Sequence, residues 1–220
     1  MGIWPMRVPY KISLSMGALV LLAVAGVCSW LFVYTGDLPD TDHLSQFAPS
    51  VQSLVFDSCL ASPSIAIPFD RIGKTLQDAL AAAESPTSLP DQIAGTLMCN
   101  HSGGMGRYHL NSFRLSWHIR RRFSEQQLFI IYANRAYFGS GASGVESASK
   151  QFFRKDADTL NTEEAALLAG LLRAPDYLSP YKHPEKALQR RNQVLEAMVA
   201  QGKLSASDAA RAEATPVVTQ

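Results

Sequence analysis

Cysteine and excess charge are both scarce in this sequence. Its 220 residues include three cysteines, and 20 basic residues face 19 acidic ones, which leaves a formal net charge of +1. So few cysteines exclude a disulfide-dense scaffold, and none lies in a C-x-x-C pair or near a histidine at zinc-ligand spacing. The balanced charge gives no reason to expect nucleic acid as a partner. The 47% share of hydrophobic residues suffices for a buried core, which excludes a disordered chain.

An uncharged segment over residues 12–34 dominates the N-terminus. Its length matches the ~20 residues of a membrane-spanning helix, whereas its bulky Trp-Leu-Phe-Val-Tyr end is a poor match to a cleaved signal peptide. Arg7 and Lys11 precede the segment and three aspartates follow it, and basic residues favour the cytoplasmic side. We therefore expect a single-pass anchor in a bacterial inner membrane, with residues 1–11 as a cytoplasmic tail and the remaining chain in the periplasm.

Two cysteines, Cys59 and Cys99, lie in the part of the chain that this topology exports. Disulfides persist in such a compartment, so one interpretation is that the two residues pair. The other interpretation is that they are two separate small buried hydrophobes, because the sequence gives no distance between them. A disulfide between Cys59 and Cys99 is therefore a prediction with an open alternative.

The exported part begins with little regular structure and then becomes helical. Residues 35–53 are rich in Pro, Asp and Ser and are predicted to form a linker, and the two short apolar runs in 54–67 predict a β-hairpin. A glycine-rich stretch at 101–106 and a glycine-containing loop at 133–144 are expected to interrupt the helices. The ranges expected to be helical are 72–84, 91–99, 110–122, 144–153, 162–172, 184–202, 205–214 and the segment that opens at Ser124 with a capping box.

Residues 134–198 carry a long, ungapped resemblance to a known family. They contain N-R-x-Y-F-G, G-x-x-G-V-E, E-A-A-L-L-A-G-L, A-P-x-x-x-S-P and R-R-N-x-V-L. This stretch resembles the carboxyl-terminal half of the peptidoglycan glycosyltransferase domain, family 51 of the glycosyltransferases, which occurs in monofunctional transglycosylases and class A penicillin-binding proteins. The resemblance implies a mainly α, lysozyme-like domain over residues 54–200 with a small β-hairpin, followed by a C-terminal helix and tail over 201–220.

Upstream of this stretch the resemblance continues, with departures. Residues 67–84 resemble the segment that leads into the family motif E-D-x-x-F, which places Glu84 on the motif's glutamate. Residues 87–98 resemble the end of S-T-I-T-Q-Q-L-A and place Gln92 on its last glutamine. The segment that connects these motifs in the family is absent. The third motif, R-K-x-x-E, falls on residues 108–112, where the basic pair and the glutamate are missing.

The resemblance implies a reaction in which a glutamate deprotonates an acceptor hydroxyl while a lipid-linked donor loses its diphosphate. The resemblance implies that Glu84 is the general base. The residues alone favour the alternative that Glu84 is a solvated carboxylate at the end of a helix. Tyr108, His109 and Ser112 replace the groups that meet the leaving diphosphate, and loss of one such group costs ~10²–10³ in rate. We therefore expect a weakly active or non-catalytic protein of peptidoglycan biosynthesis, a pseudoenzyme. The alternative is an active glycosyltransferase with Glu84 as base.

Local charge points to the ligand-binding residues. Residues 92–124 contain five arginines and no acidic residue. On a helix, Arg114, Arg121 and Arg122 share one face, which is suited to lipid phosphates, although a solvated basic face is an equal alternative. Arg107 lies next to the lost motif and is a candidate for the diphosphate role, and Gln92 is the remaining implied ligand-binding residue.

The expected partners are membrane lipid, lipid II or glycan strands, and other cell-wall synthesis proteins. No resident metal or other cofactor is expected, although a divalent metal that arrives with a diphosphate substrate stays an open alternative. Glu146 matches a family glutamate and is interpreted as structural, holding the glycine loop. Tyr132 and Tyr137 are assigned to the core.

Overall fold

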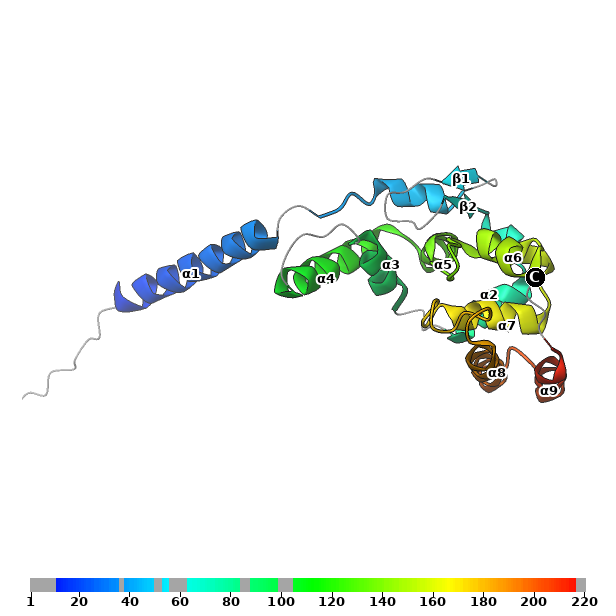
Figure 1. Ribbon diagram of the computed structural model, residues 1–220. Coiled ribbons are helices and arrows are strands. Elements are labelled where there is room, and N and C mark those ends of the chain that lie inside the picture. The colour runs from blue at the N-terminus through cyan, green and yellow to red at the C-terminus, as the bar shows by residue number, and fades with distance from the viewer. Residues whose placement is uncertain are drawn as a thin grey trace, which may run out of the picture.

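The computed structural model describes residues 11–35, 38–49, 53–55, 63–83, 88–98 and 105–216, and these are mainly helical (Figure 1). Glu84, Cys59 and Cys99 lie outside the described residues, so the disulfide stays a prediction. The elements are α1 (Lys11–Thr35), η1 (Asp42–Phe47), β1 (Ser53–Val55), β2 (Ser64–Ala66), η2 (Phe69–Arg71), α2 (Lys74–Ala83), α3 (Leu89–Leu97), α4 (Met105–Arg122), α5 (Glu125–Arg135), α6 (Val145–Phe153), η4 (Ala157–Thr159), α7 (Thr162–Leu171), α8 (Pro184–Ala200) and α9 (Ala206–Ala214), where η marks a short 3-10 helix.

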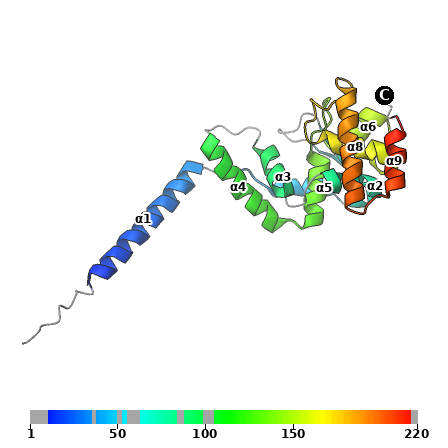
Figure 2. The ribbon, with the colours of Figure 1, turned by 90° about the horizontal axis from the view of Figure 1, so that it is seen from below.

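Helix α1 extends away from the body formed by the other helices (Figures 1 and 2). Its side chains over residues 17–30 are exposed. In the portion of the chain that the structure describes, no helix reaches the length and hydropathy needed to cross a bilayer.

The predicted hairpin is present, but the predicted linker is not wholly irregular. Strands β1 and β2 pair antiparallel, with Leu54 opposite Ile65. Within the interval 35–53, η1 forms a helical turn whose Leu44 and Phe47 are fully buried. These two side chains pack against the rest of the core. Such a contact between distant segments cannot be predicted from a Pro- and Ser-rich composition.

Helix α7 is the centre of the core, because α2 and α8 pack against it. All of its residues from Ala165 to Leu171 are buried. Its N-cap is Asn161, which forms a capping box with Glu164 through hydrogen bonds of 3.0 and 3.1 Å. At Gly170, an added Cβ would lie 3.1 Å from Cγ of Arg190 on α8, so the glycine permits the close approach of the two helices.

Helices α3, α4 and α5 form the part of the body nearest to α1. Helix α4 begins at Met105, five residues earlier than expected, and therefore includes part of the glycine-rich stretch. It packs on α3, where the Ser116 hydroxyl donates a hydrogen bond to Asp91. The capping box at Ser124 is confirmed, and α5 continues to Arg135, so the following loop begins three residues later than expected.

Candidate functional site: two adjoining cavities

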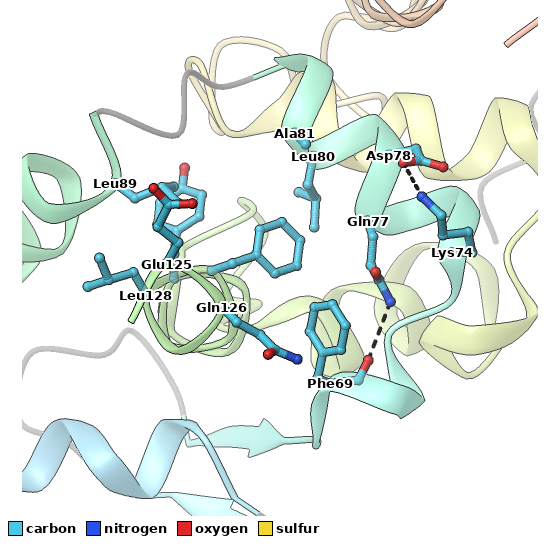
Figure 3. A pocket seen from close by; sticks show the side chains of 12 residues that line it. Phe69, Lys74, Gln77, Asp78, Leu80, Ala81, Leu89, Glu125, Gln126 and Leu128 are labelled. Carbon is cyan, nitrogen blue, oxygen red and sulfur yellow. Dashed lines mark hydrogen bonds and ion pairs between the residues drawn. The ribbon is translucent and has the colours of Figure 1, made fainter. Parts of the chain in front are cut away.

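An apolar cavity of about 520 Å³ lies where α2, α5 and the start of α3 meet (Figure 3). Phe69 and Leu80 point into it, and the Phe69 ring meets the Phe129 ring edge-on with centroids 6.1 Å apart. Lys74 and Asp78 form an ion pair of 2.5 Å at one side of the cavity. A cavity with walls of this kind accommodates hydrocarbon. Its lining residues are Phe69, Lys74, Gln77, Asp78, Leu80, Ala81, Leu89, Glu125, Gln126, Leu128, Phe129 and Tyr132.

A second cavity, of about 440 Å³, is more polar. In its wall, the Gln92 amide nitrogen donates a hydrogen bond to the Ser88 hydroxyl at 3.0 Å. The Tyr137 hydroxyl donates to Asp176 at 3.2 Å, and the exposed Arg173 adds a cation. The lining residues are Gln92, Gly95, Thr96, Tyr132, Ala136, Tyr137, Leu172 and Arg173.

Tyr132 lines both cavities, so they adjoin each other along α5. Its side chain is almost fully buried, with 6% of its surface exposed. One cavity has mainly apolar walls. The other is lined by the amide of Gln92, the hydroxyl of Tyr137 and the guanidinium of Arg173. Together they suit an amphiphilic ligand that has an apolar chain and a polar or anionic group.

Buried polar side chains at the end of α5 hold the walls in place. Asn134 is fully buried, and its amide nitrogen donates to the carbonyls of Phe47 and Ile67 at 2.7 and 2.8 Å. Its amide oxygen accepts from the Ile67 backbone at 3.1 Å. Arg135 donates to the Thr96 hydroxyl at 2.9 Å and places its guanidinium 5.1 Å from the centroid of the Phe47 ring. These contacts join α5 to η1, to the segment after β2 and to α3.

The glycine loop after α5 is close-packed at one position. Gly144 has φ of +80°, and a Cβ added there would lie 2.5 Å from the Asn134 carbonyl oxygen. A side chain at Gly144 would therefore be strained and would also displace the segment that carries Asn134. The second glycine of the tract G-x-x-G-V-E thus has a local steric reason in this chain.

Glu146 is structural, as predicted, but it holds a different segment. It is 2% exposed, and its carboxylate accepts a hydrogen bond from the Ala157 backbone at 2.9 Å and pairs with Lys150 at 2.7 Å. The hydrogen bond to Glu146 raises the pKa of Lys150 above its ordinary value, and the charge of Asp156 at 3.4 Å adds to the effect. The carboxylate therefore fixes the turn after α6 and not the glycine loop.

Comparison with known proteins identifies the family of this chain. The model of the transglycosylase family matches residues 86–199, which is more than half of the chain. The chain belongs to the transglycosylase family.

The transglycosylase relatives are larger proteins. The chain is 38% identical over 119 residues to penicillin-binding protein 1A of Aquifex aeolicus, which covers 54% of this chain and 16% of the relative. It is 32% identical over 130 residues to penicillin-binding protein 1F of Bacillus subtilis, which covers 59% of this chain and 18% of that protein. The chain thus spans less than a fifth of the length of these two relatives.

A solved structure shows the same fold. The crystal structure of penicillin-binding protein 1A from Haemophilus influenzae superposes with a TM-score of 0.51 at 19% identity, and the alignment covers 78% of this chain and 22% of that one. The mainly α transglycosylase fold that the resemblance implied is therefore present in the described residues.

The predicted ligand-binding residues separate into two groups within this transglycosylase domain. Gln92 lies in the polar cavity, whereas none of the four predicted arginines, all on α4, lines either cavity. Arg122 pairs with Asp42 at 2.6 Å, and the Arg121 guanidinium stacks on Trp117 at 4.2 Å from the ring centroid. The other two, Arg107 and Arg114, are half-buried on the same helix.

The position on which the resemblance places the third motif borders the polar cavity. Tyr108 packs against the core, and its hydroxyl lies beside Gly95, where an added Cβ would be 3.9 Å away. Gly95 itself lines the polar cavity. His109, in contact with the Tyr108 ring at a centroid distance of 5.6 Å, is exposed. A phenol thus borders the cavity at the position where the family motif has a basic residue.

Sequence reasoning missed three residues of the site. The core assignment of Tyr132 is confirmed by its burial, but the residue also lines the polar cavity, as do the half-buried Tyr137, which was assigned to the core, and Arg173, which was not singled out. Tyr137 belongs to N-R-x-Y-F-G, and Arg173 immediately precedes A-P-x-x-x-S-P. Both tracts carry the family resemblance, and this was the available signal.

Proposed function

We propose that this chain is a membrane-anchored member of the transglycosylase family that binds a lipid-linked sugar precursor of the cell wall and has weak or no polymerising activity. The observation that carries the proposal is the pairing of an apolar and a polar cavity along one shared side chain, Tyr132. Such a pair matches a ligand that joins an isoprenoid-like chain to a charged diphosphate and sugars.

The polar cavity has too little positive charge for efficient departure of a diphosphate. Among the described residues that line it, Arg173 is the one cation, and the border position 108 carries a phenol. Charge that develops on a leaving diphosphate requires preorganised cations or a metal ion, and loss of one such group costs ~10²–10³ in rate. Binding without efficient turnover is the consequence.

The anchor in this proposal is the uncharged segment over residues 12–34. It supports a placement in the bacterial inner membrane with the domain in the periplasm, because basic residues precede it and aspartates follow it. Helix α1 covers this whole segment and extends away from the body (Figure 1). Other cell-wall synthesis proteins are its proposed partners.

A second candidate is an active glycosyltransferase with Glu84 as general base. One observation favours it: α2 ends at Ala83, and Ala81 in its last turn lines the apolar cavity. Glu84 is therefore the residue that follows a helix bordering the site. A carboxylate in such a place suits a general base if an acceptor hydroxyl lies within hydrogen-bond reach.

Labelled lipid II and the full chain in detergent distinguish the two candidates. We expect saturable binding that Arg173→Ala and Gln92→Ala weaken, and that Arg211→Ala, an exposed arginine on α9, leaves unchanged. We expect no glycan polymer from the wild type. Polymer that forms with the wild type and disappears with Glu84→Gln would establish the second candidate. Binding that neither cavity substitution alters would overturn the first.

A further inference from the structure

Helix α4 is apolar on two opposite sides. Leu115 and Ile119 are fully buried in the core. On the other side of the helix, Phe113 is 71% exposed and Trp117 is 52% exposed, and Leu110 between them and the first turn is 37% exposed. The core of the domain covers only the first of these faces, so the second is an apolar surface without cover among the described residues.

The exposed face is a single stripe with basic margins. Leu110, Phe113 and Trp117 follow one another at spacings of three and four, which aligns them along the helix axis. Arg121 continues the stripe and stacks on the Trp117 ring, and Arg120 lies on its opposite margin. The helix has 18 residues and is thus about 27 Å long. We name these five residues the α4 stripe.

The surroundings of the α4 stripe favour a lipid surface. The carboxyl end of α1 lies beside the first turn of α4 in both ribbon views, and the two helices are in contact (Figures 1 and 2). Over residues 17–30, α1 exposes apolar side chains on every side. Whatever surrounds α1 is therefore adjacent to α4 as well.

Charge separates a lipid surface from a second copy of this chain. Residues 92–124 contain five arginines and no acidic residue, although the whole chain is almost neutral. Two copies that met through their α4 stripes would bring Arg120 and Arg121 of one copy close to the same residues of the other, which is unfavourable. The phosphates of an anionic bilayer would instead attract them, at about 1 kcal/mol for each arginine near the surface.

We propose that α4 lies along the surface of an anionic bilayer, with Phe113 and Trp117 at the headgroup level and the arginines on phosphates. Aromatic rings that lie at this depth, next to arginines, are the usual arrangement for an interfacial helix. This contact is separate from the two cavities, and it fixes how the domain is turned above the membrane. It therefore extends the proposed function and does not depend on the identity of the sugar ligand.

Trp117 itself reports this contact. The full chain with Trp4→Phe and Trp30→Phe retains Trp117 as its one tryptophan, and it is reconstituted into vesicles of phosphatidylcholine or of phosphatidylcholine with a third phosphatidylglycerol. Lipids with brominated chains quench tryptophan that lies at the bilayer. We expect stronger quenching of Trp117 in the anionic vesicles than in the neutral ones. We also expect concentrated salt to reverse the difference, because it screens the arginine–phosphate attraction.

Two substitutions with matched controls sharpen the result. Arg121→Gln should weaken the membrane contact of Trp117 about fivefold, the effect of one arginine at the surface, and Phe113→Ser should weaken it as well. Arg211→Gln on α9 and Tyr177→Ser, whose ring is 58% exposed on another segment, should leave it unchanged. Circular dichroism of every variant verifies that the helices persist.

Two outcomes would overturn the proposal. The first is equal Trp117 quenching in neutral and anionic vesicles, insensitive to salt and to Arg121→Gln. The second is a blue shift of Trp117 that grows with protein concentration in detergent alone, which would assign the α4 stripe to a contact between copies of the chain. Neither outcome bears on lipid II binding by the cavities, which Arg173→Ala tests separately.

Discussion

The carboxyl-terminal part of the domain bonds buried polar side chains to backbone atoms, whereas α4 also presents arginines and aromatic rings on its outside. From Ser124 onward, polar groups such as Asn134 and Glu146 are buried and bonded to backbone atoms of distant segments. On α4, Arg120, Arg121 and Arg122 are exposed, as are the rings of Phe113 and Trp117, and Arg121 stacks on Trp117. The first region therefore maintains the fold, and the second presents a surface.

This contrast coincides with the distribution of family resemblance. The tracts that match the family most fully carry Asn134, Gly144 and Glu146, each of which has a steric or hydrogen-bonding reason within the fold. The departures concentrate at the third motif, on Tyr108, His109 and Ser112 of α4. The residues that this chain shares with the family in these tracts are thus ones that the fold requires.

The largest expected effect tests the buried polar network. Asn134→Leu should lower the free energy of unfolding by about 3 kcal/mol or more, because it leaves two carbonyls and one backbone N–H without their partner. Urea denaturation of the full chain in detergent measures this. Gln201→Ala, an exposed amide just after α8, is the control and should change the free energy little. An Asn134→Leu variant as stable as the control would remove the contrast between the two regions.

A smaller effect is expected from the glycine loop. Gly144 and Gly141 both have positive φ, at +80° and +83°, but nothing lies within 4 Å of a Cβ added to Gly141. Gly141→Ala should therefore cost only the backbone strain, about 1–2 kcal/mol. Gly144→Ala should cost about 1–3 kcal/mol more, because its methyl group also meets the Asn134 carbonyl. Equal unfolding midpoints for the two variants would show that the crowding at Gly144 is relieved at no cost.

A still smaller effect concerns the Glu146–Lys150 pair. The folded state raises the pKa of Lys150 because its ammonium group donates a hydrogen bond to Glu146. The associated stability is fully present below the unfolded pKa of about 10.5 and is lost as the pH rises through the folded pKa. Because the Lys150 side chain is 43% exposed, we expect a contribution below about 1 kcal/mol.

Comparison of the wild type with Lys150→Gln isolates the contribution of the Glu146–Lys150 ion pair to the free energy of unfolding. Urea midpoints of the two proteins should converge as the pH rises above about 10.5 and the wild type loses its ion pair. Other lysines and tyrosines titrate in both proteins and cancel in the difference. A difference in stability that stays constant across this range would mean that Lys150 stabilises the fold through packing of its alkyl chain and not through its charge.

The sequence allowed the regular helices to be predicted well, because their signals are local. Pro184 opens α8, the capping box opens α5, and Asn161 caps α7, each through contacts within one turn. The predictions were wrong where contacts between residues far apart in the sequence determine the local structure. Leu44 and Phe47 turn the expected linker into part of the core, and the burial of Asn134 extends α5 into the expected loop.

The candidate site was predictable only in part for the same reason. Gln92 was found through its resemblance to a family motif, and it does line the polar cavity. The side chain that joins the two cavities, Tyr132, lies in the middle of a helix, where its apolar neighbours favoured a core assignment. On α4, Leu115 and Ile119 are buried while Phe113 and Trp117 form a second, exposed apolar face, which the sequence analysis did not identify.

The smallest expected effect is on the surface region. Phe113→Ser removes a ring that is 71% exposed, so the free energy of unfolding should change by no more than about 0.5 kcal/mol. Phe138→Ser, which removes a fully buried ring, is the contrasting variant and should destabilise strongly. Urea denaturation of both in detergent measures the difference. If Phe113→Ser lost stability comparable to Phe138→Ser, the ring would belong to the folding core, and α4 would present no separate surface. A near-silent Phe113→Ser means that a large aromatic ring stands in a position where folding does not require it, which is the condition under which its exposure serves a contact outside the domain.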